Sequence, residues 1–275
     1  MKRLLRSTLS TLSYHALRLT PQPSESLRIL TYHRVTDAHP DDRLCVPVKR
    51  FAEQMRYLRK AGFSTLGVAD AVRWLAGEEP QHGKAEGNTQ KAKAGSIIIT
   101  FDDGFEDNFL YAYPAMARYG LTGTFFIPSA FIEGGPDTHP QADRPMTRAQ
   151  LLELLDQQHE IGAHSVTHVK LTTVSFPQVR REVHDSKVAL ERLLEHPIEV
   201  FCYPSGDYDE EVKREVAAAG YVGACTVEPG ANLPGTDPFA LRRTEVSAFD
   251  TLWDFEKKLA GAYDWLHRMA QRVKR

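Results

Sequence analysis

Two aspartates stand side by side directly after an apolar run, in the stretch SIIITFDDGFEDN (residues 96–108). The carboxylates of Asp102 and Asp103 repel each other, and burying either one without a partner costs free energy. A bound cation is a sufficient partner, because it neutralises one carboxylate and fixes its geometry. The pair therefore raises the question of a metal site.

A second stretch, GAHSVTH (residues 162–168), carries two histidines four positions apart. Within one turn or tight loop, His164 and His168 can point at a single centre. A catalytic zinc ion is held by three protein ligands and keeps a fourth position for water. Asp102 or Asp103 would supply the third ligand. Each motif is weak by itself, because a chain with 11 histidines produces this spacing by chance and Asp-Asp-Gly is also an ordinary turn.

The elements that carry these motifs alternate between strand and helix along most of the chain. Residues 27–33 and 96–101 are apolar runs of strand length, and residues 48–62 show helical spacing. This alternation, repeated about seven times, predicts parallel strands with helices outside, closed as a barrel or open as a doubly wound sheet. In a barrel, functional residues gather at the C-terminal ends of the strands. The candidate residues at or just past such ends are His33, Asp102, Asp103, His164 and Ser205.

Composition places the chain among ordinary soluble globular proteins, with 275 residues, 42% of them hydrophobic and 25% charged. The formal net charge of -2 gives no electrostatic reason to expect nucleic acid as a partner. The three cysteines form no CxxC pair, so they indicate neither a disulfide framework nor a cysteine zinc site. The sequence contains no P-loop, GxGxxG or GxSxG motif, so nothing indicates nucleotide binding or a serine nucleophile.

The N-terminal stretch MKRLLRSTLSTLSYHALRLT (residues 1–20) is basic and is interrupted by serines, threonines and a histidine. It lacks the continuous apolar core of a secretion signal and is too short and polar to span a bilayer. We interpret residues 1–26 as a basic, weakly amphipathic helix before a single domain over residues 27–275. Packing on the domain is the expected role, and peripheral membrane contact through residues 1–20 is the alternative. The missing signal favours the cytoplasm or its membrane face, with the periplasm as the alternative.

Three motifs, TFDDGFEDN, HSVTH and YPSGDY, resemble those of the polysaccharide deacetylases, the family-4 carbohydrate esterases with a NodB-type domain. The resemblance spans residues 27–247, which is nearly the whole chain. It implies a distorted (β/α)7-type barrel, in agreement with the periodicity. It also implies a metal-dependent hydrolase that removes N-acetyl groups from a polysaccharide, such as an exopolysaccharide, or from a lipid-linked saccharide, and releases acetate.

The resemblance implies a role for each site residue. The first aspartate of the motif, Asp102, matches the general base, and the second, Asp103, matches a metal ligand. His164 and His168 complete the ligand set, and the backbone N–H of Ser205 matches the oxyanion donor. The implied cofactor is a divalent metal, Zn²⁺ first, with Co²⁺, Ni²⁺ or Mn²⁺ as alternatives. Such a metal polarises the amide carbonyl and acidifies a water, whose proton the base takes.

The sequence departs from the family pattern at the position of an arginine that holds the base aspartate in many members. This chain has Cys202 there. Arg242 or Arg243 could supply the charge from a later strand. Neighbouring residues of a strand face opposite ways, so only one of the two arginines can do so, and Arg243 is favoured.

The second departure concerns the general acid, which the family usually takes from a C-terminal histidine. After residue 247 the sequence has only His267, which is poorly placed in a helical stretch. His33, in LTYHRV, is the replacement, because a branch that includes the poly-N-acetylglucosamine deacetylases is similar in its N-terminal YHxV motif. In a closed barrel the first and last strands are neighbours, so His33 could protonate the leaving amine. The alternative for His33 is a strand-end histidine with local hydrogen bonds.

Other functions stay open at this point. The same residues would serve another metal-dependent amidase or an O-deacetylase, and the sequence does not separate these from an N-deacetylase. A non-catalytic carbohydrate-binding protein is disfavoured because the base and all three ligand positions are filled. A glycosidase is disfavoured because adjacent aspartates are poorly arranged to straddle a glycosidic bond. Residues 128–145 and the polar stretch 78–95 are expected to be loops, and the first is the better candidate for bordering the site.

Overall fold

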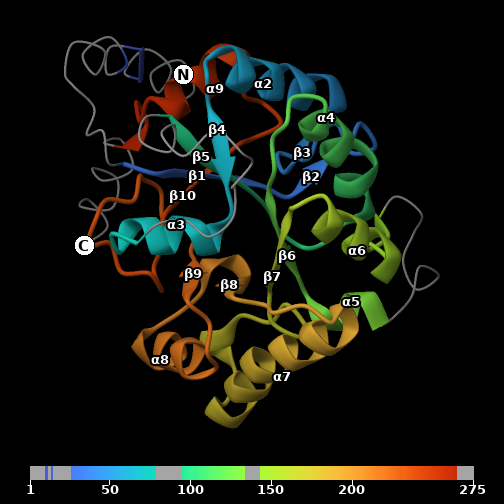
Figure 1. The fold of residues 1–275 in the computed structure, drawn as a ribbon, viewed down its shortest axis with the longest axis vertical. Helices are drawn as coiled ribbons and strands as arrows, with labels where there is room; N and C mark the ends of the chain where they lie inside the picture. Colours follow the sequence, from blue (N-terminus) through green and yellow to red (C-terminus); the bar gives the residue numbers. More distant parts are fainter. Residues whose placement is uncertain (1–9, 12–13, 15–25, 79–94, 134–142, 265–275) are drawn as a thin grey trace.

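The computed structural model describes residues 10–11, 14, 26–78, 95–133 and 143–264 of the chain. Within these residues, parallel strands form a nearly closed barrel and most helices lie around its outside (Figure 1). The predicted α/β class and distorted (β/α)7-type barrel are confirmed. The strands of the main sheet are β1 (Arg28–Tyr32), β4 (Ser64–Leu66), β5 (Ser96–Phe101), β6 (Thr124–Ile127), β7 (Glu160–Ala163), β8 (Val200–Cys202), β9 (Gly223–Cys225) and β10 (Arg243–Glu245).

The strand order of the sheet is β10-β1-β5-β6-β7-β8-β9. The first and last strands, β1 and β10, pair in parallel, as the barrel expectation required. Strand β4 pairs with β5 up to Ile98 and β6 pairs with β5 from Thr100 onward, so two strands share one edge of β5. A single bridge between Cys225 and Leu241 narrows the remaining gap beside β9.

The helices follow the strands in sequence, and short elements complete the connections. The helices are α2 (Val48–Lys60), α3 (Val68–Leu75), the π-helix η1 (Asn108–Ala112), α4 (Tyr113–Ala117), α5 (Ser129–Glu133), α6 (Arg148–Asp156), the 3-10 helices η4 (Leu171–Thr173) and η5 (Pro204–Gly206), α7 (Phe176–Leu194), α8 (Glu210–Ala218) and α9 (Leu252–Leu259). Strands β2 (Arg34–Val35) and β3 (Cys45–Val46) pair with each other outside the barrel. None of the described helices is long and apolar enough to cross a membrane.

Several sequence expectations are corrected in detail. Residues 128–145 are not loop throughout, because α5 begins directly after β6. The last described helix, α9, begins at Leu252, where the side chain of Thr251 caps it by accepting from the backbone N–H of Asp254. Residues 79–94, most of residues 1–26, and His267 lie outside the described residues. The division at residue 26 and the membrane contact of residues 1–20 therefore stay predictions.

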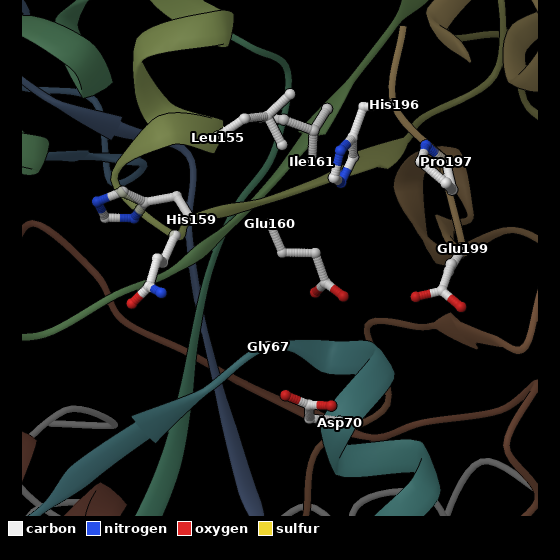
Figure 2. A pocket seen from close by; sticks show the side chains of 10 residues that line it. Gly67, Asp70, Leu155, His159, Glu160, Ile161, His196, Pro197 and Glu199 are labelled. Atoms are coloured by element: carbon white, nitrogen blue, oxygen red, sulfur yellow. The ribbon is translucent and has the colours of Figure 1, made fainter. Parts of the chain in front are cut away.

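Helix α3 covers the N-terminal end of the barrel. Its first backbone N–H group, at Val68, donates to Glu160 Oε2 at the start of β7 (2.6 Å). A side chain added at Gly223, where β9 begins, would meet Val72 of α3 at 2.6 Å. Figure 2 shows Glu160 pointing from β7 toward the beginning of α3 at Gly67. The candidate site residues follow the C-terminal ends of the strands, so they lie at the end of the barrel opposite α3.

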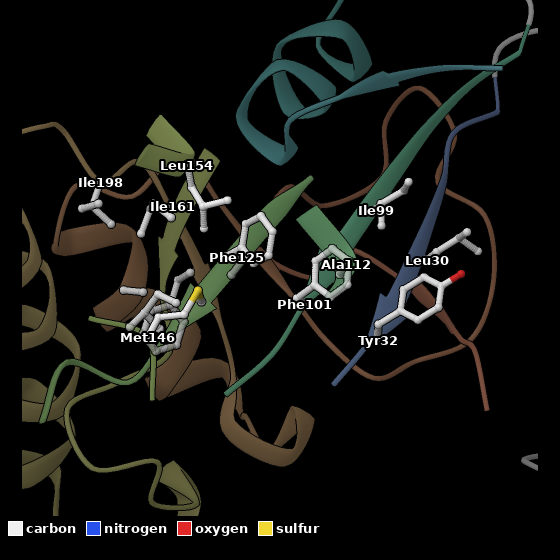
Figure 3. Close-up of a cluster of buried hydrophobic side chains, with 14 of the residues drawn as sticks. Leu30, Tyr32, Ile99, Phe101, Ala112, Phe125, Met146, Leu154, Ile161 and Ile198 are labelled. Atoms are coloured by element: carbon white, nitrogen blue, oxygen red, sulfur yellow. The ribbon is translucent and has the colours of Figure 1, made fainter. Parts of the chain in front are cut away.

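Alternation along the strands separates two apolar clusters. On one face of β5, Phe101 stacks on Phe125 of β6 with 4.8 Å between ring centroids, within the larger cluster that the outer helices cover (Figure 3). On the other face, Ile98 packs with Val68 and Val72 of α3. Strand β5 is buried along its whole length, so the position of the residues that follow it, Asp102 and Asp103, is set by a rigid strand.

Candidate metal centre

Three predicted ligands converge past the ends of β5 and β7. Nε2 of His168 lies 3.1 Å from Oδ1 of Asp103, and Nε2 of His164 lies 3.5 Å from the same oxygen. The three candidate ligand atoms all lie within 4.8 Å of one another. Two imidazole nitrogens and one carboxylate oxygen form a donor set that suits zinc and leaves a position for water or substrate.

The ring of His164 is fixed from behind. Its Nδ1 lies 2.7 Å from the backbone oxygen of Cys202, and because a carbonyl oxygen only accepts, Nδ1 carries the proton. The other ring nitrogen, Nε2, faces Asp103. A metal-binding histidine usually has its second nitrogen held in this way, since the hydrogen bond sets the tautomer and orients the ring.

The loop that carries His168 is held by a buried carboxylate on α7. Oε2 of Glu182 accepts from the backbone N–H groups of Val166 and Thr167, both at 2.9 Å. Within the loop, Ser165 has a φ of 63° and His168 a φ of 62°, so the chain turns sharply through left-handed backbone. Glu182 is 5% exposed. Sequence reasoning missed this residue, because one glutamate within a helix gives no local signal.

Asp103 itself has left-handed backbone, with a φ of 72°, and Gly104 follows with a φ of 69°. Aspartate is among the few residue types that visit this region. Burial raises the pKa of the Asp103 carboxyl, but hydrogen bonds from His164 and His168 outweigh burial and hold that pKa well below its ordinary value. Asp103 is therefore ionised and ready to bind a cation.

The neighbouring Asp102 has a different partner. Nη1 and Nη2 of Arg243 each donate to one oxygen of its carboxylate, both at 2.7 Å. Arg243 is also fixed through Nε, which donates to the backbone oxygen of Thr226 (2.7 Å). Burial raises the pKa of Asp102, but the guanidinium outweighs it, so the pKa lies below its ordinary value. Asp102 thus stays charged although it is only 3% exposed.

The side chain of Cys202 contacts both members of this ion pair. Its Sγ is 3.1 Å from Nη2 of Arg243 and 3.8 Å from Oδ2 of Asp102. Burial raises the pKa of the Cys202 thiol well above its ordinary value, so the thiol is neutral. Arg242 lies elsewhere, with Nε 4.0 Å from Glu228. Of the two arginines proposed from the sequence, Arg243 is the one in contact with Asp102.

His33 and Ser205 border the centre from two other strands. Nε2 of His33, past the end of β1, lies 3.9 Å from Oδ2 of Asp102, and its side chain is 20% exposed. Ser205 is exposed on η5 after β8 and has a φ of 57°. A side chain at the following Gly206 would lie 2.8 Å from the backbone nitrogen of Val227, so the close approach there requires glycine.

Comparison with known proteins agrees with the motifs. The family model described as polysaccharide deacetylase matches residues 89–224, a range that excludes both His33 and Arg243. YxkH of Bacillus subtilis (strain 168), whose name provisionally places it among the polysaccharide deacetylases, is 30% identical over 228 residues, which cover 83% of this chain and 74% of that protein.

Solved structures share the fold. The deacetylase PplD of Streptococcus pyogenes, solved in complex with acetate, has a TM-score of 0.73 at 22% identity and covers 87% of this chain and 99% of its own. IcaB from Ammonifex degensii has a TM-score of 0.69 at 20% identity and covers 87% of this chain and 97% of its own. These two likenesses concern the fold alone. The family model and the likeness to YxkH show that the chain belongs to the polysaccharide deacetylase family.

Proposed function

We propose that this protein is a metal-dependent N-deacetylase that hydrolyses acetamide groups on a saccharide and releases acetate. Membership of the family supports deacetylation of a saccharide. The observation that carries the metal dependence is the convergence of Asp103, His164 and His168 on one point. The metal we propose is divalent, with zinc first because two of the three ligands are imidazoles.

The residues present fit such an ion. Asp103 is held in its charged form, and the hydrogen bond from Nδ1 to the Cys202 carbonyl presents the other ring nitrogen of His164 to the centre. A divalent cation bound there would polarise the acetamide carbonyl and acidify a water molecule. Cobalt, nickel and manganese ions are alternatives for the same donor set.

The other residues move protons and steady charge. Asp102, which Arg243 keeps ionised, accepts a proton from the water as the water oxygen bonds to the acetyl carbon. The backbone N–H of Ser205 donates to the carbonyl oxygen as negative charge develops on it. His33 then gives a proton to the sugar nitrogen as the C–N bond breaks, which leaves acetate and a free amine.

An acetate-release assay on N-acetylglucosamine oligosaccharides tests this proposal. Treatment with a chelator should abolish release and a divalent metal should restore it, with metal content measured in parallel. His164→Ala should lose both the metal and the activity. Full activity in chelated, metal-free protein would contradict metal dependence. Acetate release from O-acetylated substrates alone would identify an O-deacetylase, and shortening of the oligosaccharide would identify a glycosidase.

A further inference from the structure

A cavity of about 260 Å³ opens beside the metal-ligand aspartate. Its walls are two phenylalanine rings and a proline ring, and a second carboxylate lies at its edge. The lining residues are Asp103, Phe105, Phe131, Asp143 and Pro145. One water molecule occupies ~30 Å³ in the liquid, so the cavity is several times larger than the methyl group of an acetyl substituent. It has room for a larger part of the substrate.

The two segments that form one wall are tied to each other. Phe105 and Pro145 form an antiparallel bridge. Two backbone hydrogen bonds, of 2.8 and 2.9 Å, join residues 104–106 to residues 144–146. Segments distant in the sequence therefore present their rings at a fixed spacing, as a preformed binding site requires.

A buried guanidinium positions both the aromatic and the acidic part of the cavity. The central carbon of the Arg34 guanidinium lies 4.2 Å from the ring centroid of Phe105. Nη1 of Arg34 donates to Asp143, and Nε donates to Asp107 at 2.7 Å. Arg34 is 7% exposed. The guanidinium covers one face of Phe105, and Phe105 also lines the cavity. The face of the ring that is turned away from Arg34 is therefore the one left for a ligand.

We propose that this cavity binds a sugar ring of the substrate, with Phe105 as the stacking surface, Asp143 as a hydroxyl acceptor and Arg34 as the positioning residue. The inference rests on the proposed function and deepens it. One face of a pyranose carries C–H groups, which pack favourably on the negative face of an aromatic ring. Hydroxyls around the sugar ring donate to a carboxylate. An acyl chain would fit the apolar walls but would gain nothing from Asp143.

Paired substrates separate this subsite from the metal centre. We would compare an N-acetylglucosamine tetrasaccharide with N-(2-hydroxyethyl)acetamide, which has the same amide and no ring. Phe105→Ala should raise KM for the tetrasaccharide about five- to tenfold, with kcat within about twofold. The value of kcat/KM for the ring-free amide should not change. Phe105→Tyr should restore the tetrasaccharide KM, and Tyr111→Ala, which alters an exposed aromatic residue on η1, is the matched control.

Arg34→Lys tests the positioning role, because lysine keeps the charge but loses the planar group that lies on the ring and forks to two carboxylates. It should raise the tetrasaccharide KM and spare the ring-free amide. The double variant with Phe105→Ala should cost less than the sum of the two single effects, since both act on one contact. Equal losses for both substrates would show that Arg34 acts through the fold or the metal centre, and would overturn its role.

Binding measured by calorimetry keeps the subsite distinguishable from the chemistry. If wild type binds the tetrasaccharide and Phe105→Ala weakens Kd, but no acetate is released, the proposed function fails and the subsite stands. If wild type releases acetate but Phe105→Ala changes neither Kd nor KM, the subsite fails and the proposed function stands. Tighter binding of a long-chain N-acyl amine than of the tetrasaccharide would also overturn the sugar assignment.

Discussion

Two carboxylates at opposite ends of the barrel are held in opposite ways. Asp102, past the end of β5, meets a full positive charge on Arg243, and its pKa lies below the ordinary value. Among the described residues, the donors to Glu160, at the start of β7, are all neutral: the backbone N–H groups of Val68 and Ala69 and the hydroxyl of Thr124. Burial raises the pKa of Glu160 in spite of these donors.

The difference lies in the partner rather than in the position at a strand end. A guanidinium offsets the free-energy cost of burying a carboxylate and keeps the carboxylate ionised. A general base needs this ionised form to accept a proton. Neutral donors satisfy the hydrogen bonds of Glu160 and attach α3 to the sheet, but they do not hold a negative charge as firmly. The carboxylate of Asp102 at the C-terminal end is thus held as a charged group, whereas the carboxylate of Glu160 at the N-terminal end attaches a helix to the sheet.

The largest effect is expected when the charge at the C-terminal end is removed. Asp102→Asn keeps the shape of the side chain but removes the base, so acetate release should fall ~10²–10⁴-fold. Glu160→Gln is the matched control, because it makes the same change in chemistry at the other end, and it should leave the rate within about threefold. A similar loss of rate in both variants would show that the two ends do not differ as described.

The next largest effect is expected on the free energy of unfolding, when the positive partner of Asp102 is removed. Arg243→Leu leaves Asp102 buried without compensation, so urea unfolding should show a loss of about 3–5 kcal/mol. The exposed neighbour provides the control, because Arg242→Leu should change stability by no more than about 0.5 kcal/mol. Adding Asp102→Asn to Arg243→Leu should recover part of the loss. Equal effects of the two leucine variants would disprove the pairing.

At the N-terminal end, stability should depend on pH through His159. Burial lowers the pKa of His159 to about 4 from an ordinary 6.5, and Nδ1 accepts from the backbone N–H of Gly123 (3.0 Å). The unfolded chain therefore binds a proton first as pH falls. Stability from this residue is complete above about pH 6.5 and should decrease by about 3 kcal/mol toward pH 4. His159→Gln should remove that part of the slope, and an unchanged slope in urea unfolding would exclude it.

The smallest effect is expected from Glu160 and has the opposite sign. Its raised folded pKa means that the folded chain binds the proton more tightly, so its contribution to stability should fall as pH rises from 4.5 through the folded value. At pH 7, Glu160→Gln should cost about 1 kcal/mol, because some donors to the carboxylate lose an acceptor. Wild type and variant are compared at several pH values. A difference that grows with rising pH would contradict the sign.

Much of the fold and of the chemistry was readable from local patterns. The apolar run before Asp102, the His-x-x-x-His spacing and the strand–helix alternation are all short-range signals, and the structure brings these residues together. The contact between Arg243 and Asp102 was accessible only through alternation along a strand. The roles of His33 and Ser205 stay predictions.

The rest depends on contacts between distant residues. Glu182 supports the His168 loop from a helix, and Arg34 contacts Asp143, which lies 109 residues later in the sequence. The attachment of α3 by Glu160 is likewise long-range. None of these contacts has a local motif, because a single charged residue in a helix or strand looks the same whether it faces solvent or another segment.

The pairing of β1 with β10 has a consequence for synthesis on the ribosome. The proposed metal ligands, Asp103, His164 and His168, have all been synthesised once residue 168 has emerged. The partner of Asp102 comes 141 residues after it. Until β10 joins β1, Asp102 lacks the guanidinium that offsets the cost of burying its carboxylate. If the proposed function is right, a growing chain has synthesised its metal ligands well before Arg243 is available to hold its catalytic base, and we expect activity only once the last strand is in place.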